Sequence, residues 1–301
     1  MKTILITGGT GLVGQHLQKL LLEKGYHVNI LSTNPVKADL KTIFYWEPKS
    51  NEIDINAFKN VDTIVHLAGA NIAEGRWSAD RKKLIVDSRT ETSNLIFNTL
   101  KKTQHQVKTI VSSSATGYYG AITTEKKYQE TDKSEPDFLG DTCLKWENSV
   151  DAFKQLSMRV VKLRTGIVLA KEGGIIKKLS FPIKCGLACA LGSGNQYMPW
   201  IHIDDLCNMY LKAIEDEQLQ GAYNAVAPTD VTNKIFTKAF ANSIHRPFFM
   251  PAVPAFFLKL ILGEMSAILL TGSKVSSRKI SETGFTFKYA DITKAFNNLL
   301  N

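Results

Sequence analysis

Three glycines near the start of the chain have the spacing of a phosphate-binding turn. The segment Thr7-Gly8-Gly9-Thr10-Gly11-Leu12-Val13-Gly14 stands where a short apolar run gives way to helical spacing. Glycines here allow a tight turn, close approach of the backbone to a pyrophosphate, and close packing of helix on strand. The helix that follows offers unpaired N–H groups and its positive dipole end to an anion. The pattern predicts a dinucleotide-binding loop, hence a nucleotide-binding protein, with these contacts: Gly8, Thr10, Gly11, Leu12 and Val13.

The end of a second predicted strand, His27–Ser32, bears on which dinucleotide is bound. An Asp or Glu closing this strand would accept hydrogen bonds from the ribose hydroxyls of NAD. No acid closes it: Ser32 is followed by Thr33, and Lys37 lies shortly after. A missing acid and a nearby cation favour a 2′-phosphate, so NADP is expected, with Ser32, Thr33 and Lys37 as contacts. The alternative is a solvated Lys37, with Ser32 or Thr33 serving either cofactor, which leaves NAD open.

Charged and aromatic residues follow a strand expected at 62–67. Open α/β sheets bind ligands beyond the C-terminal ends of their strands, and Glu74, Arg76 and Trp77 lie just past this one. A guanidinium can clamp a phosphate or carboxylate through two parallel hydrogen bonds, and an indole ring can stack on a ligand. We therefore expect substrate binding by Glu74, Arg76 and Trp77. An exposed salt bridge in a loop is the alternative.

The elements that position these residues alternate between strand and helix over about the first 165 residues. Further buried strands are expected at 109–113 and 159–163, with helices at 80–101 and 141–155. This alternation predicts an α/β fold, a Rossmann-type doubly wound parallel sheet with helices on both faces. Beyond Arg164 the rhythm changes, so we expect an NAD(P)-binding Rossmann domain over 1–165 and a smaller C-terminal substrate-side domain over 166–301. A strand at 222–227 that returns to the main sheet is the alternative.

Composition restricts the class of protein. The 301 residues are 44% hydrophobic and 22% charged, which excludes disordered and fibrous proteins. A net charge of +9 suits anionic small molecules, and the Lys pairs are scattered, so nucleic-acid binding is not expected. The four cysteines lack metal-ligand spacing, so we expect no metal and reduced thiols in a cytoplasmic protein. The apolar stretch at 250–270 is interrupted by Pro, Lys and Glu, so no membrane partner is expected, and a homodimer stays open.

Several further motifs resemble the extended short-chain dehydrogenase/reductase superfamily, specifically its NAD(P)-dependent epimerase/dehydratase family. Besides the glycine loop, the resemblance rests on four segments along the whole chain: His66-Leu67-Ala68-Gly69, Ser112-Ser113-Ser114-Ala115-Thr116, Trp200-Ile201-His202-Ile203-Asp204-Asp205 and Gly221-Ala222-Tyr223-Asn224. Three more features are similar to the branch called "epimerase family protein": Gly117-Tyr118-Tyr119-Gly120, the Leu191-Gly192-Ser193-Gly194 turn, and a C-terminal module at about 245–298.

The resemblance implies roles for additional residues. Further cofactor contacts would be Leu67, Ala68, Gly69, Ser112 and Arg164, although Arg164 has a structural ion pair as its alternative. Ser114 matches the serine or threonine that orients the substrate. Asn195 and Gln196 follow a turn where relatives hold a nucleotide part of the substrate, and His202 lies in a segment that orders the substrate lobe. However, Met198 stands where sugar-nucleotide enzymes commonly carry an Arg.

The chain departs from the superfamily at the catalytic dyad. In the superfamily's Tyr-x-x-x-Lys, the phenol transfers a proton, and the Lys lowers its pKa while holding the nicotinamide ribose. Here Leu139 occupies the Tyr position and Cys143 the Lys position, and neither can do that chemistry. A surviving proton transfer would need another group within hydrogen-bond reach, and the candidates are Ser114, Tyr118 and Tyr119. Packing beneath the loop is the alternative for Tyr119.

Two functions therefore stay open. The first is an NADP-dependent oxidoreductase or isomerase, similar to sugar-nucleotide epimerases. A hydride would pass between nicotinamide and a carbonyl or hydroxyl carbon of a small-molecule substrate. The second is a catalytically silent NADP(H)-binding sensor or regulatory protein. The missing dyad favours the second function, whereas the glycine loop, Ser114 and the substrate-lobe motifs favour the first.

Overall fold

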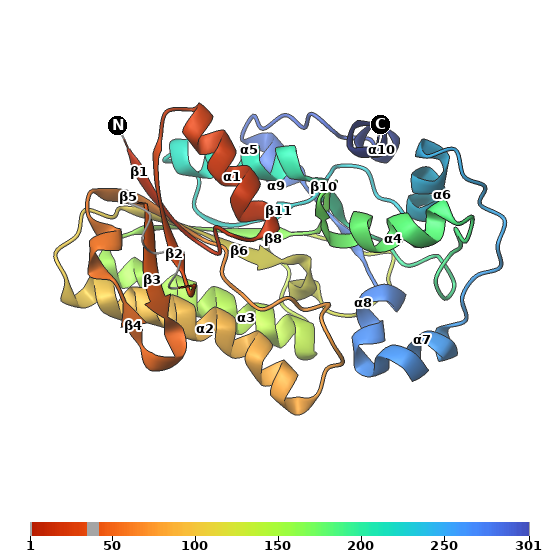
Figure 1. Cartoon of the computed structure of the whole chain (residues 1–301), viewed down its shortest axis with the longest axis horizontal. Helices are drawn as coiled ribbons and strands as arrows, with labels where there is room; N and C mark the ends of the chain where they lie inside the picture. Colours follow the sequence, from red (N-terminus) through yellow and green to blue (C-terminus); the bar gives the residue numbers. More distant parts are fainter. Residues whose placement is uncertain (1, 35–41, 301) are drawn as a thin grey trace.

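A parallel sheet forms the centre of the molecule in the computed structural model, which describes residues 2–34 and 42–300 (Figure 1). Its eight strands are β1 (Thr3–Thr7), β2 (His27–Ser32), β3 (Ile43–Glu47), β4 (Glu52–Ile53), β5 (Val61–His66), β6 (Thr109–Ala115), β8 (Arg159–Thr165) and β11 (Gly221–Ala225). They are ordered β11-β8-β6-β5-β1-β2-β3-β4, and β3–β4 is the antiparallel pair. The chain winds outward in opposite directions from β1 and β5. The switch point, where such sheets bind ligands, therefore lies between these two strands.

Helices cover both faces of the sheet, which is why its strands are apolar on both sides. Ile4, Leu5 and Ile6 of β1, for example, are fully buried. One face is covered by α1 (Leu12–Glu23) and α5 (Ile203–Glu215), and the other by α2 (Ala79–Lys102) and α3 (Phe138–Asp151) (Figure 1). The predicted Rossmann-type doubly wound sheet is therefore confirmed.

The C-terminal region is mostly helical and adds two short strand pairs. Its helices are α4 (Gly174–Lys184), α6 (Asn233–Ser243), α7 (Ala255–Leu262), α8 (Ala267–Leu270), α9 (Arg278–Glu282) and α10 (Ile292–Leu300). The strand pairs are β9 (Ile167–Ala170) with β10 (Trp200–His202), and β7 (Lys127–Tyr128) with β12 (Lys274–Val275). Strand β11 returns to the main sheet beside β8, the arrangement that the sequence left as an alternative.

Aromatic side chains hold this region together. The Phe296 ring of α10 lies 5.0 Å from that of Phe236 and 5.1 Å from that of Phe240, both on α6.

The structure also describes short 3-10 helices: η2 (Pro48–Ser50), η3 (Ile55–Phe58), η4 (Thr116–Tyr119), η5 (Ala152–Leu156) and η6 (Gly263–Ser266). The apolar stretch at 250–270 folds as α7, η6 and α8. Within 2–34 and 42–300, no helix combines the length and apolar character needed to cross a bilayer.

Asp205 ties α5 to the segment that leads into α10. Its carboxylate is 1% exposed and accepts the backbone N–H of Lys288 at 2.8 Å and of Tyr289 at 2.9 Å. Burial raises the pKa of this carboxyl, and the two N–H donors oppose that shift. The pair of hydrogen bonds fixes the C-terminal segment against the helix that lines the main core.

The variant Asp205→Asn should lower the free energy of unfolding by about 2–3 kcal/mol. Hydrogen bonds to a charged group contribute about 1.5–3 kcal/mol, and the amide keeps a single acceptor oxygen for two donors. Urea denaturation measures the change. The matched control is Asp204→Asn. The Asp204 side chain is 42% exposed, so its replacement should lower the free energy of unfolding by less than about 1 kcal/mol. Equal losses in the two variants would contradict this role.

Candidate functional site

The loop between β1 and α1 lies directly against the end of β5. Gly8 adopts φ +69°, and a Cβ added there would lie 2.9 Å from the carbonyl carbon of Leu67. A Cβ on Gly14 would overlap the carbonyl oxygen of Gly8. A side chain at either position would push α1 away from the strands. Glycine is therefore required at both.

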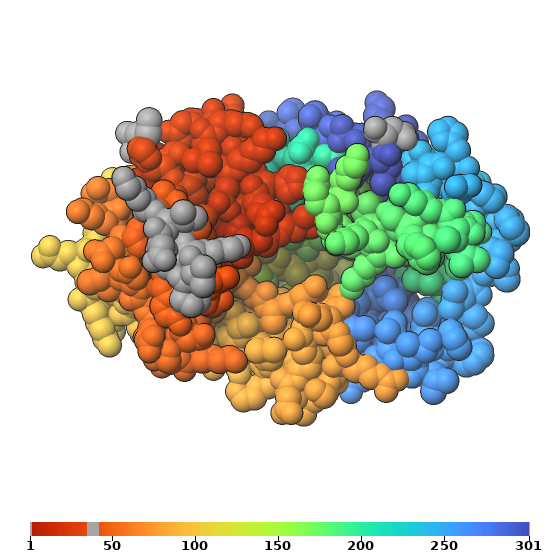
Figure 2. Space-filling model, viewed as in Figure 1, coloured from red at the N-terminus to blue at the C-terminus, as the bar shows by residue number. Residues whose placement is uncertain are grey.

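The N-terminus of α1 faces the switch point with its amides uncapped. Its N-cap is Gly11, no side chain caps it, and no acid stands in its first turn, which begins Leu12-Val13. Thr10 beside it is exposed. The positive end of the helix dipole is thus open to an anion. Figure 2 shows the surface hollowed between the red N-terminal segment, the orange segment that follows β5 and the green segment of α4.

A hydroxyl–imidazole contact holds the segment after β5 in place. Thr7 Oγ1 accepts the backbone N–H groups of Leu67 and Ala68, each at 3.2 Å, and lies 2.8 Å from Nδ1 of His66. Burial lowers the pKa of His66 to about 4, so its ring is neutral near pH 7. Gly69 follows against the guanidinium of Arg89, which donates to the Ala70 carbonyl oxygen at 3.1 Å. Of the three predicted contacts at 67–69, Leu67 and Ala68 therefore border the glycine loop, and Gly69 lies beside Arg89.

The end of β2 carries hydroxyls and no carboxylate. Ser32 is buried, and its Oγ accepts the backbone N–H of Asn34 at 3.1 Å, whereas Thr33 is exposed. Lys37, the cation predicted beside them, lies outside the described residues. Among the residues that the structure describes, the end of β2 therefore offers the hydroxyl groups of Ser32 and Thr33 and no carboxylate.

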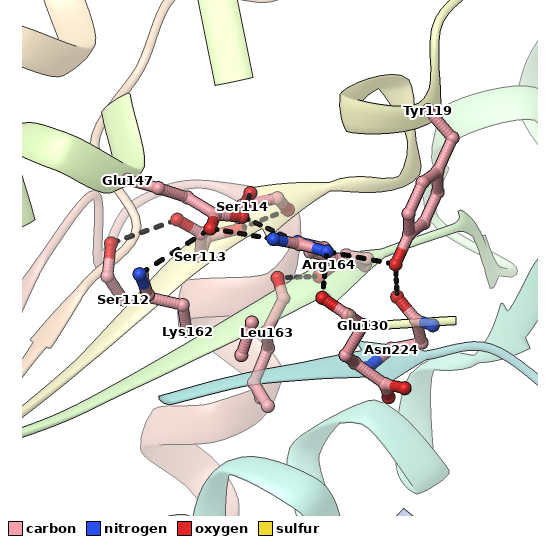
Figure 3. A network of polar contacts seen from close by, with 12 residues as sticks. Ser112, Ser113, Ser114, Tyr119, Glu130, Glu147, Lys162, Leu163, Arg164 and Asn224 are labelled. Carbon is pink, nitrogen blue, oxygen red and sulfur yellow. Dashed lines mark hydrogen bonds and ion pairs between the residues drawn. The ribbon is translucent and has the colours of Figure 1, made fainter. Parts of the chain in front are cut away.

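A buried charged network occupies the floor beneath the C-terminal ends of β6 and β8 (Figure 3). Arg164 donates to both oxygens of Glu147, at 2.7 and 3.0 Å, and Ser114 donates to the same carboxylate at 2.8 Å. Lys162 Nζ lies 3.5 Å from Glu147 and 2.7 Å from Asp151. The structure thus brings Ser114 and Arg164 together through an acid on α3 that the sequence analysis missed. Ser112 is also buried and donates to the Ser113 carbonyl oxygen.

The two tyrosines of η4 differ in exposure. Tyr119 is 1% exposed, donates to Asn224 at 2.7 Å and accepts from Arg164 at 3.0 Å. Burial raises its pKa to about 12, so its proton is held tightly. Tyr118 is half-buried, and the Arg164 guanidinium carbon lies 3.4 Å from its ring centroid. Tyr119 therefore packs beneath the loop, and Tyr118 is the phenol nearer solvent.

The two residues that the resemblance assigns to the dyad positions, Leu139 and Cys143, have buried, uncharged side chains. Leu139 and Cys143 face Gly117, where an added Cβ would meet them at 3.5 and 3.7 Å. Burial raises the pKa of the Cys143 thiol to about 12. Neither residue supplies a proton or a cation at this point.

A pocket of about 800 Å³ opens beside Leu139. Trp77 lies on the same wall, edge-on to Phe138 at 4.8 Å between ring centroids. The facing wall comes from α7, η6 and α8. Of the predicted substrate-binding residues, Trp77 is the one that the structure places on this pocket.

Arg76 and Glu74 lie outside the pocket wall. Arg76 donates through Nε to the Ile261 carbonyl oxygen at 2.8 Å and through Nη2 to that of Leu260, so it binds the last turn of α7. Glu74 is exposed and lies 3.4 Å from Arg81. Arg76 thereby connects the loop after β5 to the C-terminal module.

The remaining predicted substrate-binding residues support other segments. Gln196 is buried, and its amide donates to the carbonyl oxygens of Leu191 and Leu269, at 3.0 and 2.6 Å. Asn195 stays exposed in the turn. His202 is buried, caps α5 by accepting the Asp204 N–H at 3.1 Å, and lies outside the pocket wall.

The most informative residue missing from the sequence analysis is Glu147. It follows Leu139 and Cys143 at i+4 spacing, so all three face the same side of α3. An acid within such an apolar stripe signals a buried counterion, and Arg164 within an apolar strand is its natural partner. The pocket wall at 255–271 carried no comparable signal, because its chemistry is mostly apolar.

Comparisons with known proteins agree with this geometry. The model described as "NAD dependent epimerase/dehydratase family" matches residues 4–225, and a model of a domain of unknown function matches 253–299. An epimerase family protein of Staphylococcus aureus (strain MRSA252) is 34% identical over 302 residues, covering 100% of both chains. Among solved structures, a human epimerase family protein (isoform 2) with NADPH is 30% identical, with TM-score 0.87 and coverage of 99% of this chain and 98% of that one. A nucleoside-diphosphate sugar epimerase from Corynebacterium glutamicum is 28% identical, with TM-score 0.81, covering 99% of this chain and 58% of that one.

The buried thiol of Cys143 should be unreactive in the folded protein. With a pKa of about 12, Cys143 stays protonated near pH 8, and Cys207 behaves alike, whereas Cys185 is exposed. Iodoacetamide followed by peptide mass spectrometry should modify Cys185 first. Rapid alkylation of Cys143 in native protein, at the rate seen after denaturation, would contradict the buried geometry.

Proposed function

The chain belongs to the NAD-dependent epimerase/dehydratase family, and we propose that it binds NADP(H) in the cleft between β1 and β5. The observation that carries this proposal is the glycine contact at the start of α1. Gly8 and Gly14 bring the helix against the strands, so its uncapped amides point into the cleft. The diphosphate would bind these amides, and the backbone at 67–69 would border the nicotinamide half.

Two observations support NADP over NAD. The end of β2 presents Ser32 and Thr33 with no carboxylate to repel a 2′-phosphate. The human relative, 30% identical over nearly the whole chain, was solved with NADPH. We propose Ser32, Thr33 and Lys37 as the residues beside the adenosine ribose.

We further propose that the protein is an oxidoreductase acting on a small molecule. The bound nicotinamide supplies or accepts the hydride. Reduction of a carbonyl also needs a proton at its oxygen, and Leu139 carries none. Ser114 donates its hydrogen to Glu147, and Tyr119 is held in the buried network. Of the three candidates, Tyr118 is therefore the proposed proton donor, with the Arg164 guanidinium against its ring to stabilise a phenolate.

A silent NADP(H)-binding sensor is the second candidate function. The observation that favours it is the pair of buried, uncharged residues at the dyad positions, Leu139 and Cys143. A sensor needs the cofactor cleft and no proton donor. Both functions therefore use the cofactor cleft, and they differ in whether Tyr118 donates a proton to a substrate.

The cleft is tested by Thr10→Asp, with Thr10→Asn as its matched control. Thr10 is exposed at the N-terminus of α1, so neither change disturbs packing. The new carboxylate should repel the diphosphate and weaken NADPH binding at least about tenfold, while Asn leaves it nearly unchanged. Calorimetric titration measures the affinity. Thermal melting should show Asp neutral or slightly stabilising, because acids are favourable at helix N-termini. Equal NADPH affinity in the two variants would refute the placement of the diphosphate.

Turnover is tested by Tyr118→Phe. We expect NADPH binding to be retained and NADPH-dependent carbonyl reduction to fall at least about a hundredfold, the lower end of what general acid catalysis contributes. The assay follows NADPH absorbance with a panel of ketones and aldehydes. A wild-type protein that binds NADPH tightly yet consumes none across the panel would favour the sensor function.

A further inference from the structure

The pocket beside Leu139 lies between two walls of different origin. One wall carries Trp77, Phe138 and Leu139, from the sheet domain. The other carries Ala255, Ala267 and Leu270, from the C-terminal module. Its volume of about 800 Å³ is within the range of small-molecule sites, which are predominantly apolar. Its position at Leu139 puts it beside the place where the family carries out proton transfer.

The charges on this pocket are unsuited to a diphosphate. Its lining includes one cation, Lys259, and two carboxylates, Asp137 and Glu264. Asp137 accepts the N–H groups of Gly140 and Ala121, at 2.8 and 2.6 Å, and so stays in place as the N-cap of α3. Glu264 is paired with Lys82, whose Nζ also lies 5.2 Å from the Phe138 ring centroid, so the walls carry no excess of positive charge for a dianion.

The arginine predicted to clamp a phosphate, Arg76, is also engaged elsewhere. Arg76 donates to carbonyl oxygens at the end of α7 and is not on the pocket wall. Met198, at the position where sugar-nucleotide enzymes commonly carry an Arg, is buried with its sulfur 3.4 Å from the Asn233 amide. Neither position offers a guanidinium to a bound phosphate.

A few neutral groups remain to orient a ligand. Ser266 and Thr271 donate their hydroxyl hydrogens to the carbonyl oxygens of Gly263 and Ala267, each at 2.7 Å. Ser193 accepts the Asn195 N–H at 3.2 Å and keeps its own hydrogen to donate. The pocket therefore combines an aromatic wall with a hydroxyl donor suited to one carbonyl oxygen.

We propose that this pocket binds an uncharged, largely apolar carbonyl compound with an aromatic or alicyclic body, and that it rejects nucleoside-diphosphate sugars. The proposal rests on the proposed function for its relevance to turnover, but the binding itself depends on the pocket walls alone. The body of the ligand lies between Trp77 and Leu270. Ser193 orients its carbonyl oxygen by a hydrogen bond, and proton transfer during turnover stays the role proposed for Tyr118. The apolar residue at 139 then belongs to the substrate wall instead of to a proton relay.

Direct binding tests this assignment without turnover. The full chain, saturated with NADP⁺, is titrated with 2-acetonaphthone and separately with UDP-glucose, by calorimetry and tryptophan fluorescence. We expect saturable binding of the ketone and at least about a hundredfold weaker binding of UDP-glucose. UDP-glucose binding tighter than the ketone, or no ketone binding by protein that binds NADP⁺, would overturn the pocket assignment while leaving the proposed function intact. Absence of NADP⁺ binding would instead refute the proposed function.

Pocket-filling variants locate the site. Ala267→Phe places a ring inside the pocket and should weaken ketone binding at least about tenfold with NADP⁺ affinity unchanged; Ala255→Phe is the second variant if the first melts early. The matched control is Ala252→Phe, at an exposed residue that is not on the pocket wall. Ketone affinity equal in Ala267→Phe, Ala255→Phe and the control would place the ligand elsewhere and overturn the proposal.

Discussion

The cleft depends on one close contact, that of Gly14 on α1 with the backbone of Gly8. Without side chains at these positions, the helix can begin against β1 and the end of β5. Its free amides then face the switch point of the sheet, where an anion can bind them. On the opposite side of the cleft, Thr7 accepts hydrogen bonds from the backbone of Leu67 and Ala68 and contacts His66, which fixes the segment after β5. The cofactor half of the site is therefore a property of backbone, with little reliance on charged side chains.

The other side of the cleft has a different character. Where we expected the positions of a phenol and a cation, α3 presents the apolar side chain of Leu139 and the thiol of Cys143, and the buried charges are those of Glu147 and Arg164. Removing one partner of such a pair costs about 3–5 kcal/mol, because the other charge is left buried and unpaired. Ser114 is drawn into this pair through its own hydrogen bond. The pair thus connects β6, β8 and α3 beneath the cleft. The α3 side chains on the pocket wall, Phe138 and Leu139, are apolar.

The sequence predicted what local patterns determine. The strand at 27–32 was found to the residue, because the β-branched and apolar side chains of Val28, Ile30 and Leu31 mark it between polar neighbours. Strand β3 was missed although Ile43-Phe44-Tyr45-Trp46 is an apolar, aromatic run of the kind that favours strands. Partners distant in the chain were also beyond sequence reasoning. Arg76 was predicted to bind substrate, and its carbonyl partner at Ile261 lies 185 residues away. His202 was likewise predicted to bind substrate, and it is the N-cap of α5, a position that His does not typically mark.

A crystal structure of the protein with NADPH tests the central claim most directly. The account predicts the diphosphate within hydrogen-bond distance of the backbone N–H groups of Thr10, Leu12 and Val13, and the nicotinamide ring reaching toward Leu139. The adenosine ribose should lie beside Ser32 and Thr33. A well-ordered NADPH whose diphosphate lies away from the start of α1, or crystals grown in saturating NADPH with that cleft empty, would contradict it.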